Sequence, residues 1–292
     1  SLGDSFTYGD GLYPLLSTDP NYVINNTLRK AHTYTMCLKH NMGFKDAINL
    51  GLSANNNLFI FQQLQNLMYD EKFVNTKNKF ILINLTDVYR VTLPIYEHGD
   101  WRGVGLFNVG CIENSGLLGK DKNFYTTAFL NDMKCYHDTI SAIFGIKCIL
   151  EQLQVPYYIF TAIADINEES FSYTFHDRRY PTNLLVDTNG VTEYRTPFEN
   201  YKSLLNTGFG HYDYPMNVEK YANVYEDIDI SNATNLMTYM QQYAMHLYKS
   251  DASIYIDKYC NETGHWNADG HVLAANILSH LISQQDYSYL EK

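Results

Sequence analysis

The first residues of the chain with an evident chemical use are Gly3-Asp4-Ser5-Phe6-Thr7. A serine that leaves a strand into a tight turn presents its hydroxyl at the carboxyl edge of the sheet. The backbone N–H of the turn then faces the space in front of that hydroxyl. Such a serine can attack an acyl carbon once a base accepts its proton. The tripeptide Gly-Asp-Ser arises by chance in many proteins, so a catalytic role needs a base elsewhere in the chain.

A candidate base lies near the other end of the chain, between Glu262 and His271. His265 stands in a loop before an apolar helix, where its imidazole could reach over the sheet edge. Glu262, three residues earlier, could accept the Nδ1–H and stabilise the imidazolium; Asp257 is the alternative acid. His271 falls inside the helix, and we expect it to be structural. The residue types and their order predict a triad of Ser5, His265 and Glu262.

Strands and helices are predicted to alternate along the chain. Continuous apolar runs are typical of strands covered on both faces, and apolar residues at helical spacing predict helices between them. This alternation indicates βαβ units, a mostly parallel sheet and an α/β fold. The first strand would end at Gly3-Asp4, but only four residues precede Ser5 and a strand usually needs about five. We therefore expect that some native residues before Ser1 are missing. The other expected strands cover 45–50, 80–83, 155–160 and 254–256, and the expected helices cover 28–40, 56–69, 125–153, 232–248 and 269–282.

We expect residues 1–292 to form a single domain. Two stretches do not fit a minimal α/β scaffold: 88–123 is rich in glycine and aromatic residues, and 165–215 is polar and aromatic with little periodicity. Long loops in compact domains are usually functional. In an open α/β sheet they gather at the carboxyl ends of the strands, where ligands bind. We interpret both stretches as insertions that shape a substrate cleft.

Four short motifs stand in a fixed order along the chain. They are Gly3-Asp4-Ser5, Asn49-Leu50-Gly51-Leu52-Ser53, Asn84-Leu85-Thr86-Asp87 and His265-Trp266-Asn267-Ala268-Asp269-Gly270-His271. In this order they resemble the sequence blocks of the SGNH (GDSL-type) hydrolase superfamily, and they span nearly the whole chain. The resemblance implies a flavodoxin-like three-layer α/β/α sandwich with Ser5 as the nucleophile. It also implies that the Ser5 and Gly51 N–H groups donate hydrogen bonds to an oxyanion.

Two positions depart from the family pattern. The third block usually reads Gly-x-Asn-Asp, and its Asn donates to the oxyanion, whereas this chain has Thr86 at that position. Loss of one such donor typically lowers the rate about 10²–10³-fold. Thr86 could donate its hydroxyl, and Asn55 or Asn56 could take over, while Asn84 lies about 6.6 Å further back along the strand. The second departure is Glu262, which stands where the family usually has Asp.

Composition disfavours several classes of protein. The net charge is −11 and Lys and Arg form no dense patch, which argues against a nucleic-acid partner. No run of about 18 apolar residues predicts a membrane span. The five cysteines are an odd number without a CxxC pair, so neither a metal site nor a disulfide framework is indicated. Reduced thiols favour a reducing compartment. We expect an intracellular or virion-associated protein, with a secreted form that has lost its leader as the alternative.

Together these features favour a serine esterase that needs neither a metal nor an organic cofactor. Aromatic, Asn-rich insertions would suit an O-acetylated glycan, because aromatic rings stack on sugar faces and amides bind hydroxyls. One alternative is a degenerate hydrolase fold kept as a binding or structural module. Another is an O-acyltransferase that uses the same groups on an acceptor hydroxyl. The predicted substrate contacts are Asn55, Asp87 and Trp101.

Overall fold

The computed structural model describes residues 1–13, 21–87, 90–97, 100–106, 132–163, 211–212 and 235–283, which form a mixed α/β fold. Two parallel strands, β1 (Ile81–Leu85) and β4 (Tyr157–Thr161), lie at its centre, and every residue of both is buried. The short strand β5 (His211–Tyr212) pairs in parallel with the other edge of β4. The apolar runs that predicted two buried strands are therefore confirmed.

Two further stretches extend this ladder beyond β1. Residues 1–3 lie directly beside β1, where Leu2 exchanges backbone hydrogen bonds of 2.9 and 3.0 Å with Leu82 and Asn84. Residues 48–52 lie on the far side of residues 1–3, with the bonds spaced as in parallel strands. Their N–H donors are Leu50 and Leu52, and the acceptors are the carbonyls of Ser1 and Gly3. The order across the ladder is therefore 48–52, 1–3, β1, β4, β5.

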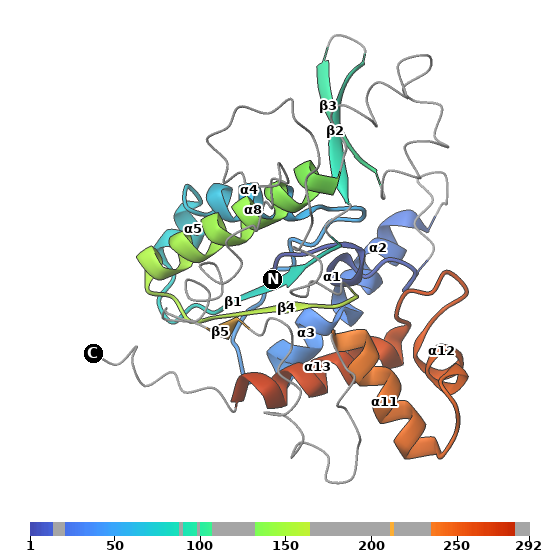
Figure 1. Ribbon diagram of the computed structural model, residues 1–292. Helices are drawn as coiled ribbons and strands as arrows, with labels where there is room; N and C mark the ends of the chain where they lie inside the picture. Colours follow the sequence, from blue (N-terminus) through green and yellow to red (C-terminus); the bar gives the residue numbers. More distant parts are fainter. Residues whose placement is uncertain are drawn as a thin grey trace, which may run out of the picture.

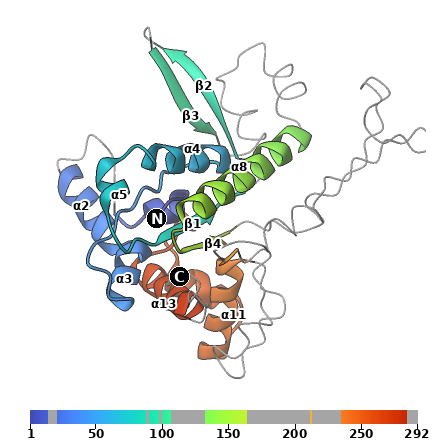
Figure 2. The same ribbon diagram turned by 90° about the vertical axis from the view of Figure 1, so that its left-hand side faces the viewer.

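Helices cover both faces of these strands (Figures 1 and 2). On one face, α4 (Asn57–Leu67) and α8 (Asp132–Leu153) pack against Ile81, Ile83 and Leu85, the alternate residues of β1. On the other face, the packed helices include α3 (Tyr34–Asn41), α11 (Leu236–Tyr248) and α13 (Ala268–Ser283). The remaining helices are α1 (Ser5–Tyr8), α2 (Tyr22–His32), α5 (Glu71–Asn75) and α12 (Ser253–Tyr259).

Two elements differ from the sequence prediction. The expected strand at 254–256 is part of α12, because Tyr255 and Tyr259 are buried one helical turn apart while Ile256 is 56% exposed. The single helix expected over 28–40 is divided into α2 and α3 at Thr33, whose backbone is extended. Thr27 lies inside α2 and donates its hydroxyl back to the Val23 carbonyl.

Part of the first predicted insertion is a β-hairpin. Strands β2 (Val91–Glu97) and β3 (Asp100–Leu106) pair in antiparallel fashion soon after β1 ends. Residues 107–131 lie outside the described residues, as does the second predicted insertion except for β5. Within the described ranges, no helix combines the length and the apolar character needed to cross a membrane.

A cavity of about 450 Å³ lies at the amino ends of residues 1–3 and β1. Its lining includes Leu2, Ile48, Phe73 and Ile81. This is the edge of the sheet opposite to Ser5, so the cavity is not part of the candidate site.

Candidate active site

Ser5 lies where the first stretch of the ladder ends and α1 begins. Asp4 caps this short helix by accepting the Phe6 N–H at 3.1 Å, and Gly9 closes it in the left-handed conformation. The Ser5 side chain is fully buried, and its Oγ has no hydrogen-bond partner among the described residues. Leaving a buried hydroxyl unpaired costs about 1–3 kcal/mol, and such groups in native structures often have a functional reason.

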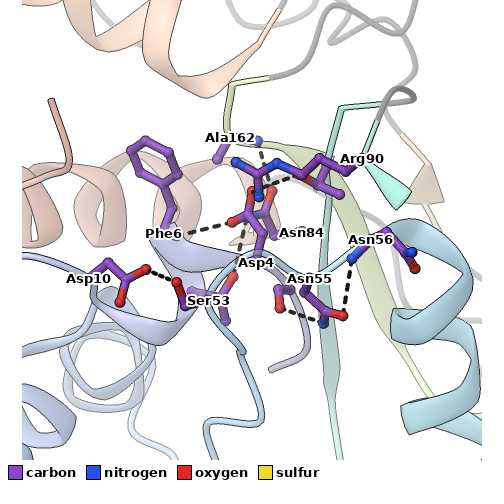
Figure 3. A network of polar contacts seen from close by, with 12 residues as sticks. Asp4, Phe6, Asp10, Ser53, Asn55, Asn56, Asn84, Arg90 and Ala162 are labelled. Carbon is purple, nitrogen blue, oxygen red and sulfur yellow. Dashed lines mark hydrogen bonds and ion pairs between the residues drawn. The ribbon is translucent and has the colours of Figure 1, made fainter. Parts of the chain in front are cut away.

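The Asp4 carboxylate is the centre of a buried polar network (Figure 3). Its Oδ1 accepts the Phe6 N–H and the Asn84 Nδ2 at 2.9 Å. Its Oδ2 accepts the Thr86 hydroxyl at 2.9 Å and Nη1 of Arg90 at 3.0 Å. Burial raises the pKa of Asp4, and the Arg90 charge most strongly opposes that shift. Asn84 also accepts the Ala162 N–H at 2.8 Å, which ties the end of β4 to the same network.

Two of the predicted oxyanion donors are engaged within the protein. The only hydroxyl proton of Thr86 is directed at Asp4, and the Gly51 N–H donates to Oδ1 of Asn49 at 2.9 Å. A Cβ at Gly51 would lie 2.5 Å from the Tyr8 backbone nitrogen, so this glycine is required for close packing against α1. The Ser5 N–H has no acceptor among the described residues and remains available to an oxyanion.

The predicted substrate contacts lie in three different settings. Asn55 is buried, and its Nδ2 donates at 3.0 Å to both the Gly3 carbonyl and Gln63. Asp87, the last residue of the third block, is half-buried. Trp101 lies on β3, where the backbone register places it opposite Tyr96.

His265 lies beside α1, with its ring centroid 5.1 Å from that of Phe6. The loop therefore brings the predicted base next to the residue that follows Ser5. The structure contains no hydrogen bond between His265 and Ser5, a bond that often forms fully only in the substrate complex. Nδ1 of His265 lies 3.0 Å from the Thr263 hydroxyl. Glu262 is exposed and makes no hydrogen bond or ion pair within the described part of the chain.

The predicted structural role of His271 is confirmed. It is 1% exposed on α13, and its Nδ1 accepts the Tyr34 N–H at 3.1 Å. Burial, with a smaller contribution from the nearby His265, lowers the pKa of His271 to about 3. The residue is therefore neutral and joins α13 to the start of α3. Asn267 caps α13 by accepting the Gly270 N–H at 2.9 Å.

Sequence reasoning did not find Arg90, Asn49 as a side-chain acceptor, or Thr263. Arg90 follows the third block by only a few residues, and a cation so close to a motif carboxylate is the one sequence signal that could have indicated its role. Among the residues that the structure describes, no cluster of His, Cys, Asp and Glu could hold a metal ion.

No protein-family model, no curated protein and no solved structure matches this chain. The function of the chain therefore has to be inferred from the geometry around Ser5 and His265.

Proposed function

We propose that the chain is a serine hydrolase acting on acyl esters, with Ser5 as the nucleophile and His265 as the general base. One observation carries the proposal: the buried Ser5 Oγ has no partner among the described residues and lies at a strand end. The histidine loop packs on the adjacent Phe6. A hydroxyl that only filled space would normally bind a backbone group, so its unpaired state is best explained by a reacting role.

The position of Ser5 in the fold supports this role. We infer a flavodoxin-like three-layer sandwich, because the ladder order is second, first, third, fourth and fifth along the chain, with helices on both faces. In such a sheet the order reverses between the first and third stretches, and ligands bind in the crevice outside their carboxyl ends. Ser5 follows the first stretch and Thr86 follows the third, β1.

The proposed reaction runs through an acyl-enzyme. Ser5 Oγ attacks the ester carbonyl while Nε2 of His265 accepts its proton, and the tetrahedral oxyanion receives the Ser5 N–H. The Gly51 N–H and the Thr86 hydroxyl can add to this stabilisation by exchanging their present acceptors for the oxyanion. Collapse expels the alcohol, which takes the proton from His265. Water activated by the same imidazole then releases the acid and restores Ser5.

We further propose that the substrate is an O-acetylated carbohydrate. The β2–β3 hairpin begins directly after Arg90, which bonds to Asp4 beside the nucleophile. Its register pairs Tyr96 with Trp101 near the tip of the hairpin, and aromatic residues are of the type that stacks on sugar faces. Asn55 and Asp87 lie closer to Ser5, at the carboxyl ends of the ladder.

Labelling with a fluorophosphonate probe tests the nucleophile. We expect wild-type protein to be labelled, Ser5→Ala to lose labelling, and His265→Ala to be labelled at least about 10²-fold more slowly, the scale of general-base catalysis. Ser253→Ala is the matched control, because Ser253 also begins a short helix but is exposed. His40→Ala controls for loss of an exposed histidine. Labelling that is absent, or that survives in Ser5→Ala, would overturn the proposal.

Acetate release tests the substrate class. Wild-type protein should release acetate from acetylated xylan or chitin fragments faster than it hydrolyses long-chain acyl esters. Transfer of the acetyl group to an added acceptor sugar, in preference to water, would instead identify an acyltransferase.

A second candidate function, a binding module on a degenerate hydrolase fold, is favoured by the engaged oxyanion donors. Thr86 and Gly51 both direct their protons at groups of the protein itself. For a module of this kind, the wild-type protein and the Ser5→Ala variant would bind glycans equally well, and neither would react with the probe. Glycan binding by the two proteins, measured by calorimetry, separates this candidate from the esterase.

A further inference from the structure

We propose that Thr263, held by Asn261, positions His265 for catalysis in place of a carboxylate. The inference rests on the proposed function in that His265 is taken as the base. It changes the third member of the expected triad, which the sequence pattern assigns to Glu262.

Hydrogen-bond donor counting fixes the direction of the contact. The Thr263 hydroxyl donates to Oδ1 of Asn261 at 2.6 Å, and that oxygen can only accept. A hydroxyl has one proton, so Thr263 must accept in its 3.0 Å contact with Nδ1 of His265. Nδ1 therefore carries the proton, and Nε2 retains the lone pair that a general base needs. A triad carboxylate selects this same tautomer.

The loop that carries these residues is closed on itself. Oδ1 of Asn261 also accepts the Thr263 N–H at 2.8 Å, which defines the orientation of the amide. The Asn261 N–H donates to the His265 carbonyl at 2.8 Å, and Cys260 forms an antiparallel bridge with Trp266. The positioning group is therefore part of a short, internally bonded turn rather than a free side chain.

The same loop packs against the turn that follows the nucleophile. A Cβ at Gly11 would overlap Nδ2 of Asn261, so the glycine leaves the space that this amide occupies. Asn261 thus touches the segment after α1 on one side and supports Thr263 on the other. This arrangement couples the position of His265 to the helix that begins at Ser5.

The orientation of the His265 imidazole does not depend on the charge of Glu262. Asp4 is close enough to interact electrostatically with His265, and so is His271 on α13. Asp4 is already paired with Arg90, and His271 is neutral. Glu262 is exposed to solvent, where water screens its charge. The orientation of the imidazole therefore comes from the neutral Thr263–Asn261 pair.

Three variants test the assignment by steady-state kinetics. Thr263→Val keeps the shape and removes the hydroxyl, so we expect kcat to fall about 10- to 100-fold at the pH optimum with little change in KM, a partial loss of the roughly 10²–10⁴-fold that general-base catalysis contributes. Thr263→Ser restores the hydroxyl and should recover most of the activity. Glu262→Gln should stay close to wild type across the pH profile. A larger loss in Glu262→Gln than in Thr263→Val would overturn the inference.

The ¹⁵N chemical shifts of the His265 ring provide a readout that does not depend on activity. We expect protonated Nδ1 and unprotonated Nε2 in wild-type protein, and a shift towards the Nε2–H tautomer in Thr263→Val. A wild-type ring protonated at Nε2 would overturn the inference even if the enzyme is active. Conversely, an Nδ1–H ring in a protein that the fluorophosphonate does not label would refute the proposed function and leave the positioning assignment intact.

Discussion

Asp4 shows how a single side chain can determine the geometry of its neighbour. Its two oxygens accept four hydrogen bonds, two each, so all the acceptor positions of the carboxylate are occupied. The donors come from α1, β1 and the segment after β1. Asp4 is fully buried and Arg90 exposes 8% of its side chain, so the pair is shielded from solvent. The carboxylate thus fixes the turn that presents Ser5 against the end of β1.

Asp4→Asn should destabilise the protein by about 3–5 kcal/mol, the cost of breaking a buried ion pair by removing one partner. The amide cannot accept all four donors and leaves the buried Arg90 charge uncompensated. Urea unfolding measures the change. Asp251→Asn, at an exposed carboxylate that accepts from Ser253, is the control and should be near neutral. A cost below about 1 kcal/mol for Asp4→Asn would contradict the assignment of this network.

At the scale of elements, α13 and α3 are joined through a buried histidine. The Tyr34 N–H, at the first residue of α3, has no acceptor inside its own helix and donates to His271 on α13. The two rings also stack, with centroids 6.0 Å apart. Protonating His271 would remove the acceptor and bury a charge, so the helix pair requires the neutral form.

This requirement predicts a pH dependence of stability. The pKa of His271 is lowered from 6.5 to about 3 in the folded protein, so its contribution is complete above pH 6.5 and is lost as the pH falls towards 3. Over that interval the unfolded state binds one more proton, which lowers the unfolding free energy by about 1.4 kcal/mol per pH unit. Chemical denaturation at a series of pH values should give a shallower slope for His271→Gln than for wild type. His40→Gln should keep the wild-type slope; parallel curves for wild type and His271→Gln would contradict the prediction.

At the scale of the whole molecule, the strands divide the interior into two apolar cores. One contains the buried faces of α4 and α8 with the odd-numbered residues of β1, and the other contains α3, α11 and α13 with Leu82. Ser5 lies at the carboxyl edge between these cores. Packing on either face therefore holds the elements that carry Ser5 and His265.

Ile277→Ala on α13 should cost about 2–5 kcal/mol, because Ile277 is fully buried and truncation leaves a cavity. Val272→Ala on the same helix, where Val272 is 46% exposed, should change stability by less than about 0.5 kcal/mol. Thermal or urea unfolding gives both values. Similar costs for the two variants would show that this face of α13 does not contribute to the core.

Local signals in the sequence determined much of the fold. Continuous apolar runs identified β1 and β4, and helical periodicity identified α4, α8, α11 and α13 within a few residues at the ends that the structure describes. The structural role of His271 followed from its place within an apolar helix. These predictions succeeded because the spacing of apolar residues along the chain shows when a whole strand or one helix face is buried. The prediction of a strand at 254–256 was wrong because three apolar residues are too few to distinguish a strand from one turn of a helix.

The tertiary structure alone decided which polar groups meet. Thr86 and Asn84 both donate hydrogen bonds to Asp4, and the Gly51 N–H donates to Asn49. The His265 imidazole contacts Thr263 rather than Glu262. Motif spacing places such side chains in the same region but does not choose among partners within reach. That choice depends on which donors and acceptors are buried together, because most buried polar groups in a folded protein are paired with the groups that packing brings to them. The sequence thus determined which residues could do the chemistry. Packing determined which of these residues keep a donor or acceptor atom that is not already hydrogen-bonded within the protein.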